Sequence, residues 1–219
     1  GQAVMEPRRC ALSVLVETLG ADAVRASALP GLASFTPGER DLLISLMEKK
    51  IQAPLTSSVG RLFDAAAALA GFGDKIRFEG QAAMELEFSL HGVTSDDLYP
   101  FEWELLPGGE QVVDWRPLFR AILGDLEKGQ ASGLISARFH NTLTEVIIRM
   151  ARAIGEKRVV LSGGCFQNKY LTERAVRRLK EEGFLPFWHR ETPPHDGCIA
   201  LGQAAVARNG GNNVSGNPG

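Results

Sequence analysis

The fold is decided by the stretch Arg158-Val159-Val160-Leu161-Ser162-Gly163-Gly164. Its short β-branched run predicts a buried strand, and the two glycines predict a tight turn where the strand ends. A helix is expected to follow over residues 168–182, because Leu171, Ala175 and Leu179 recur on one helical face. The stretch therefore predicts a strand–turn–helix unit.

The elements on either side of this unit alternate between helix and strand. Residues 131–154 predict a long helix before it, and residues 184–188 and 196–208 predict a second strand and a final helix after it. The long helix has an apolar stripe formed by Phe139, Leu143, Val146, Ile147, Met150 and Ile154. This alternation is typical of an α/β layered unit. Residues 209–219 are rich in Gly, Asn and Ser, and we expect them to be disordered.

The first half of the chain is predicted to be helix-rich. Helices are expected over residues 7–19, 37–50, 57–70, 80–91 and 116–127, with a hairpin over 101–106 and 110–115. In the second helix, Leu43, Leu46 and Met47 are expected to face inward. We place a boundary near residues 96–100, which gives a helical part over 1–95, an α/β part over 96–208 and the tail 209–219.

The composition is that of a globular protein. Of the 219 residues 44% are hydrophobic and 23% are charged, which excludes a purely disordered chain. The formal net charge of -2 gives no basic excess for a nucleic-acid surface, and the absence of an apolar run of about 18 residues argues against a membrane span. Cys10, Cys165 and Cys198 are too few for a disulfide framework, and the N-terminus lacks a signal-peptide pattern. We therefore expect a cytoplasmic protein with no nucleic-acid or membrane partner.

Gly163 and Gly164 form the first candidate site. Bare backbone after a strand, together with the N–H groups at the start of a helix, is typical of sites that bind phosphates and nucleotides. Asn168 could bond a ribose or a base edge there. An alternative is a plain strand-to-helix turn in which Asn168 caps the helix. The glycine spacing matches neither the dinucleotide fingerprint nor the P-loop.

The segment from Thr192 to Cys198 is the second candidate. His195 and Asp196 fall at the start of the last helix, and Asp196 is a candidate metal ligand. The alternative is that Asp196 caps the helix. A thiol–imidazole pair of Cys198 with His195 is not favoured, because side chains so close together on a helical turn rarely meet.

Further candidates lie in the first half of the chain. Ser58 suits the N-cap of a helix, and Asp64 is a lone acid beside a run of alanines. If Asp64 faces inward it needs a partner, such as a ribose hydroxyl; the alternative is a solvent-side pair with Arg61. Gly80 allows a ligand to approach its backbone closely.

The histidines are scattered. His140 is expected to be buried or half-buried with its hydrogen bonds satisfied, and His91 and His189 are expected to have no special role. No pair of histidines has metal-ligand spacing, so no complete metal site is predicted within this chain.

Five motifs, taken in order, carry a resemblance to a known family. They are SSVGRLFDA (57–65), FEGQAAME (78–85), ARFHNTL (137–143), LSGGCFQN (161–168) and PPHDGCIALGQ (193–203). Together they resemble the C-terminal part of the HypF carbamoyltransferases of nickel–iron hydrogenase maturation. The resemblance covers all of the chain except its tail.

The resemblance implies a Kae1-like domain. Its fold would be α/β, a partial ASKHA (actin/sugar kinase/Hsp70-like, RNase H-like) fold with a helix-rich N-terminal half. In this family a YrdC-like domain makes carbamoyl adenylate from carbamoyl phosphate and ATP. The Kae1-like domain transfers the carbamoyl group to the C-terminal cysteine of the acceptor protein HypE, and the thiocarbamate product supplies the cyanide ligand of the hydrogenase.

The resemblance also implies roles for individual residues. The nucleotide-binding residues would be Ser58, Asp64, Gly80, Gly163, Gly164 and Asn168. Asp196 matches a ligand of a divalent metal, iron or zinc, whose remaining ligands are expected outside this chain. The family more often has Asn-Asp-Gly-Gly where this chain has His195-Asp196-Gly197-Cys198, so His195 either adds a ligand or only fills the site. No catalytic residue is assigned.

Two alternatives remain open. Transferases of the Kae1/TsaD type, which modify tRNA with a threonylcarbamoyl group, share the glycine and terminal aspartate motifs, although the motifs around Asp64 and His140 fit the HypF family better. The other alternative is a catalytically inert nucleotide-binding or docking fragment. It arises because we expect the acylphosphatase-like, zinc-finger and YrdC-like domains and the first half of the ASKHA fold to lie outside the chain.

Overall fold

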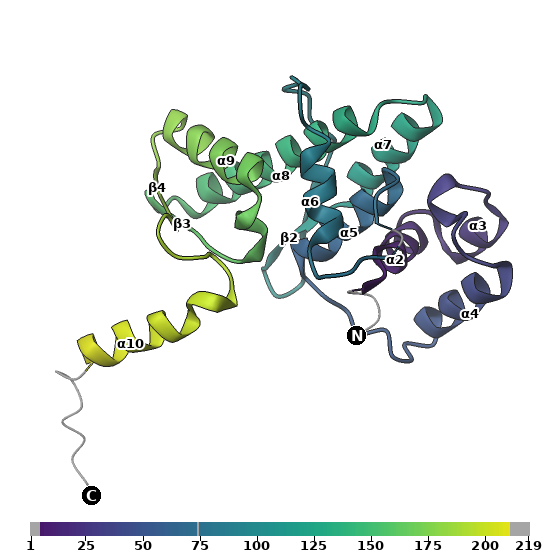
Figure 1. The fold of residues 1–219 in the computed structure, drawn as a ribbon, viewed down its shortest axis with the longest axis horizontal. Helices are drawn as coiled ribbons and strands as arrows, with labels where there is room; N and C mark the ends of the chain where they lie inside the picture. The colour runs from purple at the N-terminus through teal and green to yellow at the C-terminus, as the bar shows by residue number, and fades with distance from the viewer. Residues whose placement is uncertain (1–4, 74, 211–219) are drawn as a thin grey trace, which may run out of the picture. The chain divides into compact units, whose positions relative to one another are not determined.

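The computed structural model describes residues 5–73 and 75–210, and Figure 1 traces their path. Their contacts form two compact units, Gly1–Ile147 and Ile148–Gly219, so the division falls inside the long helix α8 (Ser132–Ile154). Each unit is described by itself below.

This division differs from the boundary expected near residues 96–100. The reason is that helix α7 (Arg116–Glu127), which follows the expected boundary, packs against the N-terminal helix α2 (Pro7–Leu19) and so belongs to the same unit. The expected parts 1–95 and 96–208 are a helical part and an α/β part of the Kae1-like domain of the family. This assignment of parts within the family's domain stays a prediction.

The first unit is built mainly from helices, as predicted. In chain order they are α2 (Pro7–Leu19), α3 (Ala21–Ala26), α4 (Pro37–Glu48), α5 (Val59–Leu69), α6 (Gln81–Phe88), α7 (Arg116–Glu127) and most of α8. The antiparallel hairpin of β1 (Glu102–Leu105) and β2 (Gln111–Asp114) lies between α6 and α7 in the sequence, also as predicted. The sequence pattern predicts neither α3 nor the 3-10 turn η1 (Pro30–Leu32), because such short elements show no apolar period.

The core of the first unit forms where α2 packs against α5. The alanines at positions 65–67 have no exposed surface, and their small side chains let the two helices approach closely. Leu12 and Leu15 of α2 and Phe63 of α5 are also buried. The alanine-rich segment is therefore a packing surface and not a solvated face.

Two predicted apolar faces differ from the observed ones. In α4 the buried residue is Ile44, whereas the predicted set is only half-buried: Leu43, Leu46 and Met47. In α8, Phe139 and Leu143 are buried as predicted, but Met150 and Ile154 are 43% and 71% exposed. The predicted stripe fails there because the last turns of α8 belong to the second unit, so a different face of the helix is buried.

The second unit contains the predicted strand–turn–helix. Its elements are β3 (Arg158–Leu161), the 3-10 turn η2 (Gly164–Gln167), α9 (Lys169–Glu181), β4 (Leu185–Trp188), the 3-10 turn η3 (Asp196–Cys198) and α10 (Ile199–Gly210). Strands β3 and β4 pair in parallel, and α9 packs against β4. Leu171, Ala175 and Leu179 of α9 are buried, as predicted. The chain mixes helix and sheet as an α/β protein does, and the finer ASKHA assignment stays a prediction.

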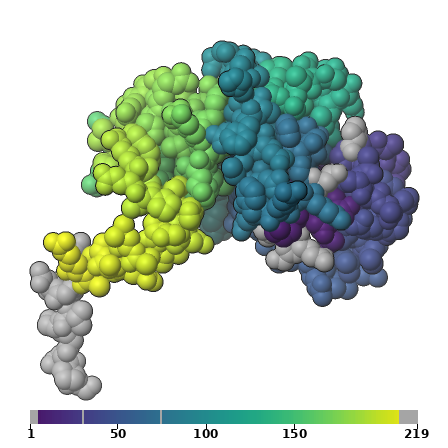
Figure 2. Space-filling view, viewed as in Figure 1, coloured from purple at the N-terminus to yellow at the C-terminus, as the bar shows by residue number. Residues whose placement is uncertain are grey.

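The prediction that β3 is a buried strand is wrong. Only Leu161 is buried, whereas Val160 is 71% exposed and Phe187 of β4 is 53% exposed. Parallel sheets normally have both faces covered. This two-stranded sheet differs, because it leaves the apolar side chains of Val160 and Phe187 exposed. The side chains of α10 are exposed over residues 199–208 as well, and Figure 2 shows the surface of this helix (yellow) open in that view.

Helix α10 continues to Gly210. The rest of the tail expected to be disordered, residues 211–219, lies outside the described residues. In the described part of the chain, no helix combines the length and the apolar character that crossing a bilayer requires.

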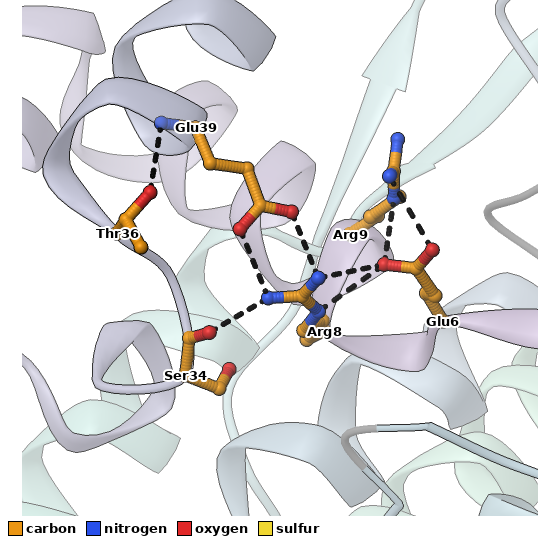
Figure 3. Close-up of polar contacts among 6 residues, drawn as sticks. All are labelled: Glu6, Arg8, Arg9, Ser34, Thr36 and Glu39. Atoms are coloured by element: carbon orange, nitrogen blue, oxygen red, sulfur yellow. Dashed lines mark hydrogen bonds and ion pairs between the residues drawn. The ribbon is translucent and has the colours of Figure 1, made fainter.

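Arg8, at the start of α2, connects this helix to α4 and to the segment before α4 (Figure 3). Only 6% of the residue is exposed. Its guanidinium donates to both carboxylate oxygens of Glu39 at 2.8 and 3.3 Å, to Glu6 at 2.8 and 3.2 Å, and to the carbonyl oxygen of Ser34 at 2.7 Å. It also lies over the ring of Phe35, 4.4 Å from the centroid. Every guanidinium N–H group therefore has an acceptor, and the role of Arg8 is structural.

Replacing Arg8 with Met should lower the free energy of unfolding by about 3 kcal/mol, because two carboxylates and a carbonyl lose their buried cation. Urea denaturation measures the loss. The matched control is Arg25→Met, which removes two ion pairs near the surface, with Asp22 and Glu48, and should cost clearly less. Equal losses in the two variants would contradict the structural role of Arg8.

His140 of α8 is fully buried, which confirms the prediction. Its ring lies edge-on to Phe63 and Phe139, with centroids 5.3 and 5.9 Å away. The Nδ1 atom lies 2.7 Å from the carbonyl oxygen of Ser136, so Nδ1 carries a hydrogen that it donates to this oxygen. Burial lowers the pKa of His140 to about 4.

The buried histidine should make the protein less stable as the pH falls from about 6.5 to about 4. In this range the unfolded state binds a proton that the folded state does not, and the difference corresponds to about 3 kcal/mol. His140→Gln should lack this loss, and His91→Gln, which alters an exposed histidine, should retain it. Urea denaturation of the variants at both ends of the range tests the prediction. A decline in His140→Gln as large as in the unsubstituted chain would show that another group is responsible.

Candidate functional site

The carboxyl ends of β3 and β4 form one edge of the parallel sheet. Leu161 and Trp188, the last residues of the two strands, are paired in register, so Ser162 and His189 follow them at the same edge. Open α/β sheets bind ligands beyond the carboxyl ends of their strands. The candidate site of the second unit therefore consists of the two loops that begin at Ser162 and His189.

The first loop is the glycine turn. Gly163 has φ of +104°, which favours glycine, and its N–H donates to the carbonyl oxygen of Pro194 at 2.8 Å. This bond joins the turn to the segment that precedes Asp196. Both glycines are exposed, and a Cβ at Gly164 would come no closer than 3.9 Å to another residue, the side chain of Gln167. The turn offers bare, accessible backbone, as predicted.

Asn168 begins α9 and caps it. Its Oδ1 accepts a hydrogen bond from the N–H of Leu171 at 2.8 Å, and the residue is largely buried. The helix-cap alternative is therefore confirmed. A contact between Asn168 and a nucleotide stays a prediction.

The cap of η3 is His195 and not Asp196. The Nδ1 of His195 accepts a hydrogen bond from the N–H of Gly197 at 3.0 Å, so the alternative in which Asp196 is the cap is wrong. Asp196 is exposed; its backbone carbonyl accepts from the N–H of Ile199, and its carboxylate forms no hydrogen bond or ion pair within the described residues. Among those residues, no three His, Cys, Asp or Glu side chains come together to hold a metal. The metal-ligand role of Asp196 stays a prediction that needs ligands from outside this chain.

Asp64 of α5 is a buried carboxylate, 2% exposed. Its Oδ2 lies 2.7 Å from Nη1 of Arg61, so the predicted Arg61–Asp64 pair forms. The pair was expected to face solvent, and this part of the alternative is wrong because Asp64 is buried. The contact lacks hydrogen-bond geometry, and no other donor reaches Oδ2. The pKa of Asp64 is raised to about 6: burial is the largest cause, Arg61 opposes it, and Glu79 adds a smaller rise. A buried acceptor of this kind suits a ligand that donates a hydrogen bond.

Arg61 connects the predicted residues of the first unit. Its Nη2 lies 3.4 Å from Oε1 of Glu79, which precedes Gly80, and its backbone N–H donates to the carbonyl oxygen of Ser58 at 3.0 Å. Ser58 occupies the N-cap position as predicted, but its hydroxyl makes no capping bond. Gly80 has φ of +85° and open space where a Cβ would lie. The structure thus groups Ser58, Asp64 and Gly80 around Arg61.

Ser162, His189 and Thr192 form a hydrogen-bonded line that the sequence does not predict. Oγ of Ser162 lies 3.1 Å from Nε2 of His189, and Nδ1 of His189 lies 3.0 Å from Oγ1 of Thr192. His189 thus has a hydroxyl partner at each ring nitrogen, and the interpretation that it has no special role stays untested. The one signal in the sequence is that Ser162 and His189 each follow directly after a predicted strand.

Comparison with known sequences gives one consistent result. The family model described as "Carbamoyltransferase, Kae1-like Domain, second subdomain" matches residues 1–203. The carbamoyltransferase HypF of Synechocystis sp. is 40% identical over 216 residues, which cover 92% of this chain and 27% of that protein. The carbamoyltransferase HypF of Rhizobium leguminosarum bv. viciae is 36% identical, covering 94% of this chain and 26% of that protein.

Solved structures agree with the sequence comparison. A crystal structure of full-length HypF in the phosphate- and nucleotide-bound form superposes with a TM-score of 0.84 at 34% identity, covering 98% of this chain and 33% of that one. The structure of T. kodakarensis HypF gives a TM-score of 0.73 at 26% identity, covering 94% of this chain and 27% of that one. The fold and the glycine turn thus fall in the class of Kae1-like domains of carbamoyltransferases. The chain belongs to the HypF family, and it spans about a quarter of the length of the curated relatives it matches.

Replacing Asp64 with Asn should change how stability depends on pH. The folded carboxyl group keeps its proton up to about pH 6, whereas the unfolded group loses it near pH 3.8. The folded state therefore binds more protons between these values, and Asp64 costs it stability as the pH rises. Relative to the unsubstituted chain, the variant should gain about 3 kcal/mol between pH 3.5 and pH 7.

Urea denaturation at the two pH values measures this gain. Asp22→Asn is the control, because Asp22 is exposed and also pairs with an arginine three positions away, Arg25. The control should show no comparable gain. If Asp64→Asn behaves like the control, the carboxylate of Asp64 is not buried as described.

Proposed function

We propose that the chain supplies part of a domain that transfers a carbamoyl group from carbamoyl adenylate to the C-terminal cysteine of the acceptor protein HypE. A YrdC-like domain would make the adenylate from carbamoyl phosphate and ATP, and the thiocarbamate product would supply the cyanide ligand of nickel–iron hydrogenase. The observation that carries this proposal is the exposed glycine turn after β3, in a chain whose matched relatives are named carbamoyltransferase HypF.

The glycine turn suits the phosphate of an adenylate. Gly163 and Gly164 expose their backbone at the carboxyl edge of a parallel sheet. The unit that contains them, residues 148–219, has eleven Lys and Arg against six Asp and Glu, a net charge of +5, although the whole chain has -2. A local excess of this sign attracts anions. The related HypF structure is described as phosphate- and nucleotide-bound, which supports the same ligand class for this chain.

Asp64 suits a hydroxyl group of the ribose. Its Oδ2 is buried and has no well-formed hydrogen bond, and a ribose hydroxyl would supply the missing donor. In this proposal Ser58, Gly80 and Asn168 keep the nucleotide contacts that the family resemblance implies.

The proposed transfer replaces one bond to the carbamoyl carbon with another. The acceptor sulfur bonds to this carbon, the bond from the carbon to the phosphate oxygen breaks, AMP leaves, and the thiol gives up its proton. The N–H of Gly163 already donates to Pro194, so the N–H groups that follow it in the turn, beginning with Gly164, would stabilise the charge on the leaving phosphate. A metal would polarise the carbamoyl or phosphate oxygen. The described residues do not fit a metal by themselves, since no group of three possible ligands forms among them, and the transfer is written without a metal step.

A second candidate is a nucleotide-binding or docking module without transfer activity of its own. The chain spans 27% of the Synechocystis protein and 26% of the Rhizobium protein, so the activity of those whole proteins is a proposal for this chain, and the module stands beside it as the other candidate. The tRNA-modifying alternative has no comparable support, because these relatives are both named carbamoyltransferase HypF.

A transfer assay separates the two candidates. The chain is mixed with carbamoyl adenylate and a peptide that ends in the HypE cysteine, and thiocarbamate is measured by mass spectrometry. Thiocarbamate formed faster than in the mixture without the chain supports the transferase. Binding of AMP without thiocarbamate supports the docking module, and the absence of both contradicts both candidates.

Gly164→Ala should weaken the binding of AMP about tenfold, which corresponds to about 1.4 kcal/mol. The added methyl group would stand between the backbone and the phosphate. It meets no atom closer than 3.9 Å in the folded chain, so the free energy of unfolding should stay the same. Calorimetric titration measures the affinity. Gly124→Ala in α7 is the control, because a Cβ there also meets no neighbour. Unchanged affinity in Gly164→Ala would contradict a phosphate contact at the turn.

A further inference from the structure

The hydrogen-bonded line of Ser162, His189 and Thr192 lies beside the glycine turn. Ser162 directly precedes Gly163, and its Oγ is 3.1 Å from Nε2 of His189. Ser162 is exposed, and His189 and Thr192 are half-buried, so a ligand at the turn can reach the line. The roles assigned above to the glycines and to Asp196 leave these three residues unexplained.

The hydrogen bonds allow His189 to accept a proton. In a neutral imidazole one ring nitrogen carries hydrogen and the other accepts. If Nδ1–H donates to Oγ1 of Thr192, at 3.0 Å, then Nε2 accepts from the hydroxyl of Ser162. A hydroxyl both donates and accepts. Ser162 can therefore take a proton from a neighbour while it gives its own to Nε2.

The nearby His195 lacks this property. Its Nδ1 already accepts from the backbone N–H of Gly197 at 3.0 Å, so the hydrogen of the neutral ring is on Nε2. Neither nitrogen of His195 is then available to take up a proton while η3 keeps its cap. Of the two histidines in this loop region, only His189 has an accepting nitrogen directed at a hydroxyl.

Carbamoyl transfer to a thiol needs a proton acceptor. An ordinary cysteine thiol has a pKa of about 8.5, so it is mostly protonated near neutral pH, and the thiolate is the reactive form. A positioned base that removes the proton during attack typically accelerates such a step by about 100-fold or more. The proposed function, on which this inference rests, assigns no group to this task.

We propose that the Ser162–His189 pair takes up the proton of the acceptor thiol, and that Thr192 positions the imidazole. As the sulfur bonds to the carbamoyl carbon, its proton passes to Oγ of Ser162, and the hydroxyl proton of Ser162 passes to Nε2 of His189. The bond between the carbamoyl carbon and the phosphate oxygen breaks, and AMP leaves. The imidazolium then releases its proton to water, so that no further reactant is required.

The first test reads the tautomers in the chain itself and does not depend on activity. Long-range 1H–15N NMR spectra of the chain labelled at histidine should show His189 with hydrogen on Nδ1 and His195 with hydrogen on Nε2. The variants His189→Gln and His195→Gln assign the signals. Thr192→Val should shift His189 toward the Nε2–H form. An unsubstituted chain with His189 in the Nε2–H form would overturn the proposal.

The second test compares transfer to two peptides that differ in one atom, one ending in cysteine and the other in selenocysteine. A selenol is already ionised at neutral pH and needs no base. His189→Gln should therefore lower kcat/KM for the cysteine peptide about 100-fold and leave the selenocysteine peptide nearly unaffected. Ser162→Ala should show the same pattern. His91→Gln, an exposed histidine of the first unit, should leave both rates unchanged.

The outcomes separate this inference from the proposed function. Equal losses on the two peptides would mean that His189 only supports the loop, and no loss on either would mean that it has no part; both results overturn the inference while transfer itself stands. If the unsubstituted chain, supplied with carbamoyl adenylate, transfers to neither peptide, the proposed function fails and the inference fails with it.

Discussion

The parallel pairing of β3 with β4 is the constraint on which the second unit depends. Because Leu161 and Trp188 end their strands in register, the chain leaves the sheet twice at the same edge, and the two loops place glycines, hydroxyls and an imidazole together. One backbone hydrogen bond, from Gly163 to Pro194, holds these loops to each other. Parallel strands need a crossover. Helix α9, which packs against β4, supplies it, and residues far apart in the sequence thereby become neighbours.

Arg8 and Asp64 are buried charged residues of the first unit that differ in whether their hydrogen bonds are satisfied. Arg8 donates every guanidinium N–H group to an acceptor of its own chain, and this completeness marks it as a structural residue. Asp64 is buried just as deeply, yet its contact with Arg61 lacks hydrogen-bond geometry. Most buried polar groups in proteins are satisfied, and the exceptions are often retained where function needs them at some cost to stability. Arg8, whose hydrogen bonds are all satisfied, is therefore a structural residue, whereas Asp64 has an acceptor atom available to a ligand.

Much of the secondary structure could be predicted, because helical periodicity and turn residues are local. The bounds of α2 and α7 agree with the sequence pattern, and so does the glycine turn. Exposure could not be predicted in the same way. A β-branched run indicates a buried strand only when a sheet is covered on both faces, and Val160 lies on a face that the described chain leaves open. In η3 both His195 and Asp196 have side chains able to cap, and the backbone geometry of the turn selects His195.

The sequence by itself determined the longer helices, the strand–turn–helix unit and the candidate residues Asp64, Gly163 and Gly164, since each depends on residues close together along the chain; five such local motifs, taken in order, also indicated the family. The tertiary structure decided which acid is buried, which residue caps η3 and which hydroxyl meets which imidazole. Ser162 and His189 are 27 positions apart, and nothing in the local pattern of either one names the other. Their contact arises from strand register and helix packing, which are properties of the whole folded unit.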